Sequence, residues 1–128
     1  MDYEGTHKLW LEPGTPVKTG PIAATLDGDV LTWRWEMGEK VYEGMLDMAA
    51  ARWRDGFHQQ DVASIDASGP TFGARFAAAY AYGPPEAPWA WRIRVCDRPS
   101  GELVVQMDNI TPWGEHAPAV EWVLAKKG

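Results

Sequence analysis

The densest group of side chains that could do chemistry lies in the segment Trp53–Gln60, which reads Trp-Arg-Asp-Gly-Phe-His-Gln-Gln. Side chains alternate between the two faces of a regular strand, so Trp53, Asp55 and Phe57 would share one face. A carboxylate beside apolar rings has its charged form disfavoured, which suits a general acid or base. Asp55 is therefore a candidate catalytic and ligand-binding residue. The structural alternatives are a pair with an interior arginine, backbone hydrogen bonds, or a bulge at Gly56 that turns the side chain outward.

The three histidines give weaker signals. His58 is the second catalytic candidate because an imidazole titrates near neutral pH, and its alternative is an ordinary residue at a loop rim. His7 and His116 lie far from it in the sequence, and no His-x-His or His-x-x-x-His spacing occurs. A metal site needs three or four ligands with matched geometry. We therefore predict neither a metal site nor a cofactor.

Two further polar residues belong to predicted strands near the end of the chain. Asn109 shares its face with Val105 and Met107, so it should point inward. A buried amide needs partners, which a ligand carbonyl or hydroxyl, or a bound water, could supply. Glu121 could face Asp55 or an arginine, although the alternation places it opposite Trp122.

The elements that must position these residues are short strands. Gly and Pro recur along the chain and leave segments that are too short for many helices, a spacing typical of an all-β fold. Within 30–37 and 89–96, apolar and polar residues alternate, as expected for strands with one buried face. We predict ten strands, at 6–12, 21–28, 30–37, 40–48, 51–59, 61–68, 71–82, 88–97, 102–111 and 117–126. Residues 45–52 also have helical propensity, so strand and helix both stay open there.

Composition limits the class of protein. The 128 residues fit one domain, carry a formal net charge of -6 and contain a single cysteine, Cys96. An acidic chain without a basic stripe argues against binding to nucleic acid or to an anionic membrane. The chain has no apolar run of signal-peptide or transmembrane length, and one cysteine suits a reducing compartment. We expect a cytoplasmic protein with one domain over residues 1–128.

Eight tryptophans are the compositional outlier. A ten-stranded antiparallel meander removes its exposed edges by closing into an up-and-down β-barrel, and a barrel of this size can hold one small ligand. Tryptophans can fill such a barrel or line a cavity in it. The side chains that we expect to line the cavity are Trp33, Trp35, Trp53, Phe57, Trp89 and Trp91, with Asp55 and Asn109 as polar groups.

Several short motifs resemble a known family: Gly5-Thr6-His7, Tyr42-Glu43-Gly44, Trp53-Arg54-Asp55-Gly56-Phe57-His58, Trp89-Ala90-Trp91-Arg92-Ile93, Asn109-Ile110-Thr111-Pro112-Trp113-Gly114-Glu115 and Ala119-Val120-Glu121. In this order the chain resembles the bacterial DUF1579 family over nearly its whole length. Members of that family are similar in architecture to lipocalins and fatty-acid-binding proteins. The resemblance implies a calycin-like barrel with a central cavity, and it implies no particular reaction.

Three functions remain open on the sequence. The leading hypothesis is a barrel that binds a small, apolar or aromatic molecule in its cavity. The alternative is an enzyme, such as an isomerase, cyclase or hydrolase, that uses Asp55 or His58 as acid or base in the same cavity. A third is an interaction protein whose barrel is filled by its own side chains. A homodimer is compatible with each of them.

Overall fold

The computed structural model describes residues 1–10, 17–57 and 61–127. Within them the chain forms ten β-strands and no helix, which confirms the all-β prediction. The described part therefore has no helix with the length and hydropathy needed to cross a bilayer. The strands are β1 (Asp2–Leu9), β2 (Lys18–Asp27), β3 (Val30–Met37), β4 (Lys40–Asp47), β5 (Arg52–Arg54), β6 (Ala63–Ser64), β7 (Phe76–Tyr82), β8 (Trp89–Asp97), β9 (Leu103–Ile110) and β10 (His116–Lys126).

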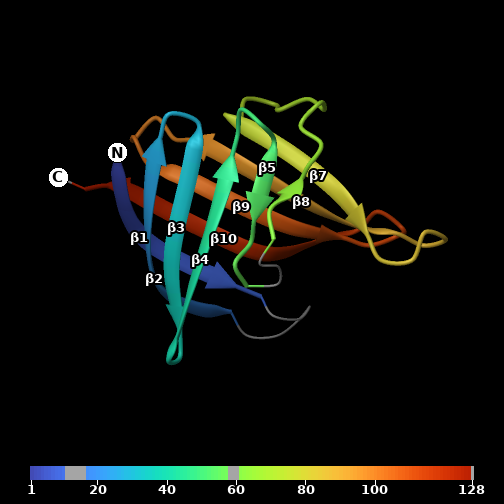
Figure 1. The fold of residues 1–128 in the computed structure, drawn as a ribbon, viewed down its shortest axis with the longest axis horizontal. Helices are drawn as coiled ribbons and strands as arrows, with labels where there is room; N and C mark the ends of the chain where they lie inside the picture. The colour runs from blue at the N-terminus through green and yellow to red at the C-terminus, as the bar shows by residue number, and fades with distance from the viewer. Residues whose placement is uncertain (11–16, 58–60, 128) are drawn as a thin grey trace.

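All ten strands form one antiparallel meander in the order β6-β5-β4-β3-β2-β1-β10-β9-β8-β7. Strands β1 to β5 make one wall and β7 to β10 the other, and β1 pairs with β10 where the two walls join (Figure 1). The two ends of the sheet meet through Asp66 and Ala79. The backbone N of each donates to the carbonyl of the other, both at 3.0 Å. The predicted up-and-down β-barrel is confirmed.

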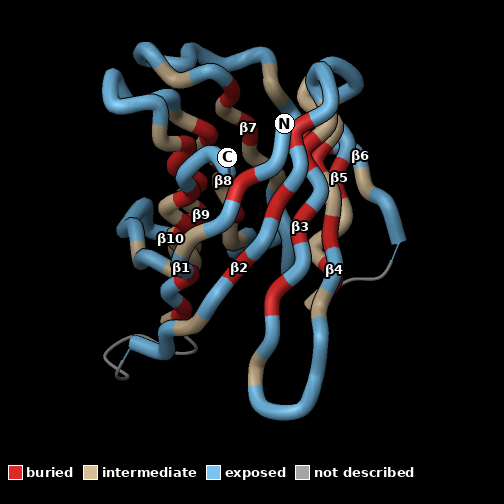
Figure 2. The backbone as a smooth tube through the Cα atoms, turned by 90° about the vertical axis from the view of Figure 1, so that its left-hand side faces the viewer, coloured by how far each residue is buried: buried red, intermediate tan, exposed pale blue. Residues whose placement is uncertain are grey.

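The alternation of β3 illustrates how the sequence specifies the buried face. Leu31, Trp33 and Trp35 are buried, whereas the residues between them are exposed. The same alternation of buried and exposed residues follows most of the longer strands in Figure 2. The flanking turns contain Gly28 and Gly38, whose positive φ of 60° and 64° fits tight hairpins. The burial of one face therefore fixes the register of these strands.

The strands around the end of the sheet are shorter than predicted. Among the described residues of the predicted strand 51–59, only 52–54 form a strand, and of 61–68 only 63–64 do. Gly56, at a φ of +81°, ends the extended backbone, while residues 58–60 lie outside the described residues. The predicted strand 71–82 begins at Phe76, because Phe72 and Gly73 take positive φ values of 49° and 86° in a turn.

Residues 45–52 are neither one continuous strand nor a helix. Strand β4 ends at Asp47, whose carboxylate accepts hydrogen bonds from the backbone N of Ala49 at 3.1 Å and of Ala50 at 3.0 Å. Ala51 then takes a positive φ of 53°. A side chain that bonds its own backbone stabilises a turn, and here it outweighs the helical propensity of the segment.

The two halves of the barrel are filled differently. Aliphatic side chains pack the half nearer to the chain termini, where Leu31 pairs with Leu46 and Leu103 with Leu124. These leucines are at most 1% exposed, so this half is a closed core. The N- and C-termini lie side by side at that end (Figure 1). The other half holds most of the aromatic rings.

Candidate functional site

A cavity of about 370 Å³ lies in the half of the barrel that is away from the termini. Several strands end near the cavity, namely β1, β3, β5, β7 and β9, and two others, β8 and β10, begin there. Side chains from most of the chain therefore lie at the same depth in the barrel. The described residues that line the cavity are Leu9, Trp10, Trp35, Trp53, Asp55, Phe57, Tyr80, Tyr82, Trp91, Met107, Asn109, Ala119, Val120 and Trp122.

A β-bulge shapes one side of the cavity. The pairing of β10 with β9 shifts register between Pro118 and Val120. A bulge places an extra residue on one strand and locally re-aims the side chains. Ala119 and Val120 therefore both line the cavity although they are consecutive in sequence.

Aromatic rings from the two ends of the sheet meet in the cavity wall. The ring of Trp53 on β5 lies 6.0 Å from that of Tyr80 on β7 and 6.4 Å from that of Trp91 on β8, centroid to centroid. In the second pair the ring planes are nearly parallel, at 16°. These ring contacts join the two ends of the sheet, which Asp66 and Ala79 also connect. The geometry of the cavity wall therefore depends on closure of the barrel.

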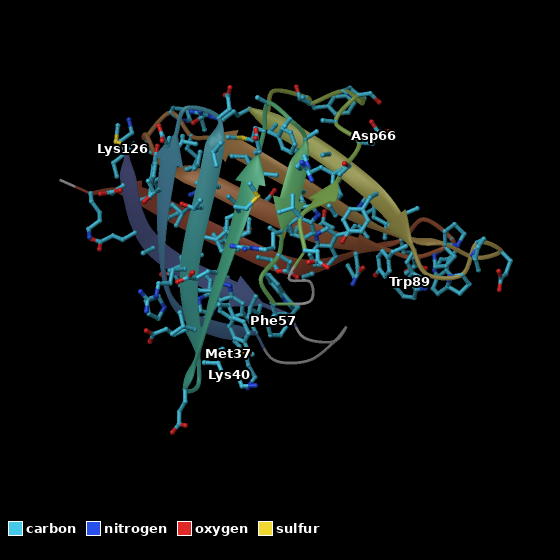
Figure 3. All side chains as sticks on the ribbon, viewed as in Figure 1. Met37, Lys40, Phe57, Asp66, Trp89 and Lys126 are labelled. Carbon is cyan, nitrogen blue, oxygen red and sulfur yellow. The ribbon has the colours of Figure 1, made fainter. Side chains whose placement is uncertain are left out.

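A second, tighter group of rings supports the wall on the side of β3 and β4. Trp35 stacks on Tyr42 at 4.7 Å and contacts Phe57 at 5.6 Å, and Tyr42 meets Phe57 edge-on at 5.0 Å. Figure 3 shows Phe57 at the same end of the barrel as Met37 and Lys40, opposite Lys126. These contacts hold the faces of Trp35 and Phe57 in fixed positions beside the cavity.

Asp55 lines the cavity directly after β5. The next residue, Gly56, packs so closely on β4 that a Cβ atom there would lie 1.8 Å from the carbonyl O of Glu43. Only glycine fits this contact and the positive φ together. This turn keeps Asp55 and Phe57 facing the cavity, although the extended backbone has already ended.

Two tyrosines on β7 add hydroxyl groups to the cavity. Burial, and then the negative charge of Asp55, raise the pKa of Tyr80 to about 12. Tyr82 donates a hydrogen bond from its hydroxyl to Oδ1 of Asn109. Burial also raises the pKa of Tyr82, and the bond to Asn109 opposes that rise. Both hydroxyls therefore keep their protons at neutral pH and can donate hydrogen bonds.

Two indole N–H groups of the cavity wall have no hydrogen-bond partner within the described residues. They belong to Trp53 and Trp122, which are 1% and 3% exposed, and both nitrogen atoms are buried. A buried donor without an acceptor costs roughly 1–3 kcal/mol.

Six of the eight predicted site residues line the cavity: Trp35, Trp53, Asp55, Phe57, Trp91 and Asn109. Trp33 does not, because its ring lies on Gly44 and packs against Trp122 at 4.8 Å. Trp89 does not either, because it pairs with the exposed Trp113 at 6.3 Å. Figure 3 shows Trp89 at the tip of the molecule that is farthest from Lys126.

The remaining polar candidates lie elsewhere. His7 is 2% exposed, with its Nδ1 atom 3.2 Å from the carbonyl O of Pro21 and its ring 5.0 Å from that of Trp35. Burial lowers the pKa of His7. His116 is exposed, with Nδ1 4.0 Å from Oδ2 of Asp108. His58 lies outside the described residues, and the described ones contain no group of three His, Cys, Asp or Glu side chains placed to hold a metal.

Glu121 lies on the strand face opposite that of Trp122, as the alternation predicts. Its carboxylate accepts a hydrogen bond from Nε2 of Gln106 at 3.2 Å, across the β9–β10 pair. Glu121 is not among the described residues that line the cavity. The contacts therefore support a structural role for Glu121.

The sequence interpretation missed several lining residues, among them Tyr80, Tyr82 and Trp122. A signal for the two tyrosines was present, because Phe76, Ala78, Tyr80 and Tyr82 alternate with alanines at a period of two. For Trp122, strand alternation predicts only a face opposite that of Glu121. Its depth along the barrel follows from the bulge in β10, which no local pattern indicates.

No protein-family model, no curated protein and no solved structure matches this chain. The resemblance to DUF1579 stays a prediction.

Proposed function

We propose that this protein is a lipocalin-like barrel that binds a small, largely apolar molecule with aromatic character. The observation that carries the proposal is the cavity of about 370 Å³, in which eight of the fourteen described lining residues are Trp, Tyr or Phe. Ligand sites typically have volumes of about 300–1,000 Å³ and apolar walls with a few placed polar groups. Asp55, Asn109 and the two tyrosine hydroxyls are such polar groups.

The cavity also favours a ligand-binding protein over an interaction protein whose barrel is filled by its own side chains. The leucine core shows that this sequence can pack a barrel half to closure. In the other half the rings of Trp53 and Trp91 stay 6.4 Å apart, centroid to centroid, and both line the cavity. An apolar occupant would bury the ring faces that line this space.

The direct test is binding of N-phenyl-1-naphthylamine, a neutral dye whose emission rises in apolar surroundings. We expect saturable binding of one dye per chain, with quenching of tryptophan emission. The Ala119→Leu substitution adds a side chain to the cavity wall and should abolish dye binding. Ala125→Leu on the same strand is the matched control, because Ala125 is exposed and does not line the cavity. Equal binding to both variants would place the dye elsewhere and contradict the proposal.

An enzyme is the second candidate, because Asp55 lies close enough to Tyr80 for its charge to raise the pKa of that hydroxyl. A carboxylate base beside a proton-bearing hydroxyl, in an apolar cavity, is an arrangement suited to isomerisation by proton transfer. Native mass spectrometry of protein from its own host would identify a co-purifying molecule. Conversion of that molecule by the wild type, but not by Asp55→Asn, would establish the enzyme. Unchanged molecule after long incubation with the wild type would exclude it.

A further inference from the structure

The described lining residues of the cavity carry charge of one sign. Asp55 is the only Asp, Glu, Lys, Arg or His among the described lining residues. Its negative charge reaches the cavity interior, since it contributes to the raised pKa of Tyr80. Asp55 also takes part in contacts within the chain. A carboxylate has two oxygens with about four acceptor positions, so it can keep such contacts and still face a ligand.

The ring faces add to this charge. An aromatic face carries partial negative charge, and a cation within about 6 Å of the ring centroid is attracted to it. Trp53 faces Tyr80 at 6.0 Å and Trp91 at 6.4 Å, so a group beside Trp53 would be near several rings at once. Trp35 and Phe57 add two more faces to the same cavity. A carboxylate and several aromatic rings that line one cavity favour cations and disfavour anions.

We propose that the cavity selects small organic cations, namely alkyl- or arylalkylammonium compounds, whose charge lies against the aromatic rings on the side of Asp55. The inference rests on the proposed binding function and deepens it by naming the ligand class. The apolar substituents of the cation occupy the aromatic wall, and the ammonium group is the element that distinguishes it from a neutral molecule of the same shape.

The test compares three probes of nearly equal shape: benzyltrimethylammonium, the neutral isostere neopentylbenzene, and the anion phenylmethanesulfonate. Each competes with N-phenyl-1-naphthylamine for the wild-type protein. We expect the cation to bind at least about tenfold more tightly than the isostere, the scale that cation–π attraction supports. The anion should bind more weakly than the isostere. This comparison uses only the wild type, so it does not depend on the folding of a variant.

Two variants then assign the preference to a residue. Asp55→Asn should bring the affinities for the cation and for neopentylbenzene to within a few-fold of each other. Asp29→Asn makes the same change in net charge in the exposed β2–β3 turn, at the other end of the barrel, and should change neither.

Each contrary result has its own meaning. Equal binding of cation and isostere, with the dye still bound, overturns the cation inference and leaves the proposed function intact. A cation preference that survives Asp55→Asn overturns the role of Asp55. Failure of the dye and all three probes to bind the folded wild type overturns the proposed function itself.

Discussion

The hydroxyl of Tyr82 on β7 donates a hydrogen bond to Oδ1 of Asn109 on β9, across the intervening strand β8. Both residues line the cavity, where the bond orients the Asn109 amide so that its NH₂ group remains a donor. Because the bond joins two strands that are not paired with each other, it ties β7 to β9 at the cavity. It also sets which polar atoms of Asn109 are free to bind a ligand.

This bond gives the first prediction. Tyr82→Phe removes the hydroxyl and should lower the free energy of unfolding by about 1 kcal/mol or less, because Tyr82 is 40% exposed. Urea denaturation of Tyr82→Phe, Asn109→Ala and the double variant would measure the coupling. The two effects should be less than additive. Strict additivity would mean that the bond contributes nothing to stability.

The second prediction concerns Trp33, which the structure places in the core. A Cβ atom on Gly44 would lie 2.4 Å from the ring of Trp33. Gly44→Ala should therefore destabilise the fold by about 1–3 kcal/mol through overpacking. In a Trp33→Leu background, where the ring is gone, the same change should cost little.

Gly69→Ala is the matched control for this pair, since no atom lies within 4 Å of a Cβ atom placed there. It should leave the free energy of unfolding nearly unchanged. An equal cost of Gly44→Ala in the presence and absence of the Trp33 ring would refute the packing that we describe.

The third prediction follows from the buried His7, whose pKa is lowered by burial. Because the folded pKa is below the unfolded one, the unfolded chain takes up a proton first as the pH falls. Stability should be fully present above the unfolded pKa of about 6.5, decrease as the pH drops below it, and stop decreasing below the lowered folded pKa.

Denaturation curves between about pH 8 and pH 5 would measure this dependence. His7→Gln should flatten it in that range, whereas His116→Gln should keep it, because His116 is exposed. A dependence that persists unchanged in His7→Gln would show that His7 is not its source.

Local pattern predicted the faces of the strands but not the depth of each side chain in the barrel. The alternation of Trp33 and Trp35 placed both inside, as observed. Only Trp35 reaches the cavity, because Trp122 from β10, a strand distant in sequence, lies against Trp33. Trp89 is predicted correctly as part of a strand, yet β8 begins with it at the tip of the molecule (Figure 3).

The position of Asp55 was predictable for a reason that is only partly correct. Strand alternation predicts that Asp55 shares a face with Trp53 and Phe57, and all three line the cavity. The strand ends at Arg54, however, and the turn at Gly56 maintains the alternation. That turn depends on the contact with Glu43 of β4, a tertiary constraint that a single segment does not reveal.

In the proposed function, the cavity, and not the exposed tip of the barrel, binds a small apolar molecule. The eight tryptophans allow a direct test, because each gives one indole N–H signal in a ¹H–¹⁵N NMR spectrum, assignable by Trp→Phe variants. Titration with N-phenyl-1-naphthylamine should shift the signals of Trp10, Trp35, Trp53, Trp91 and Trp122, which line the cavity. The signals of Trp89 and Trp113 should stay in place. Shifts confined to Trp89 and Trp113, or no shifts at saturating dye, would contradict binding in the cavity.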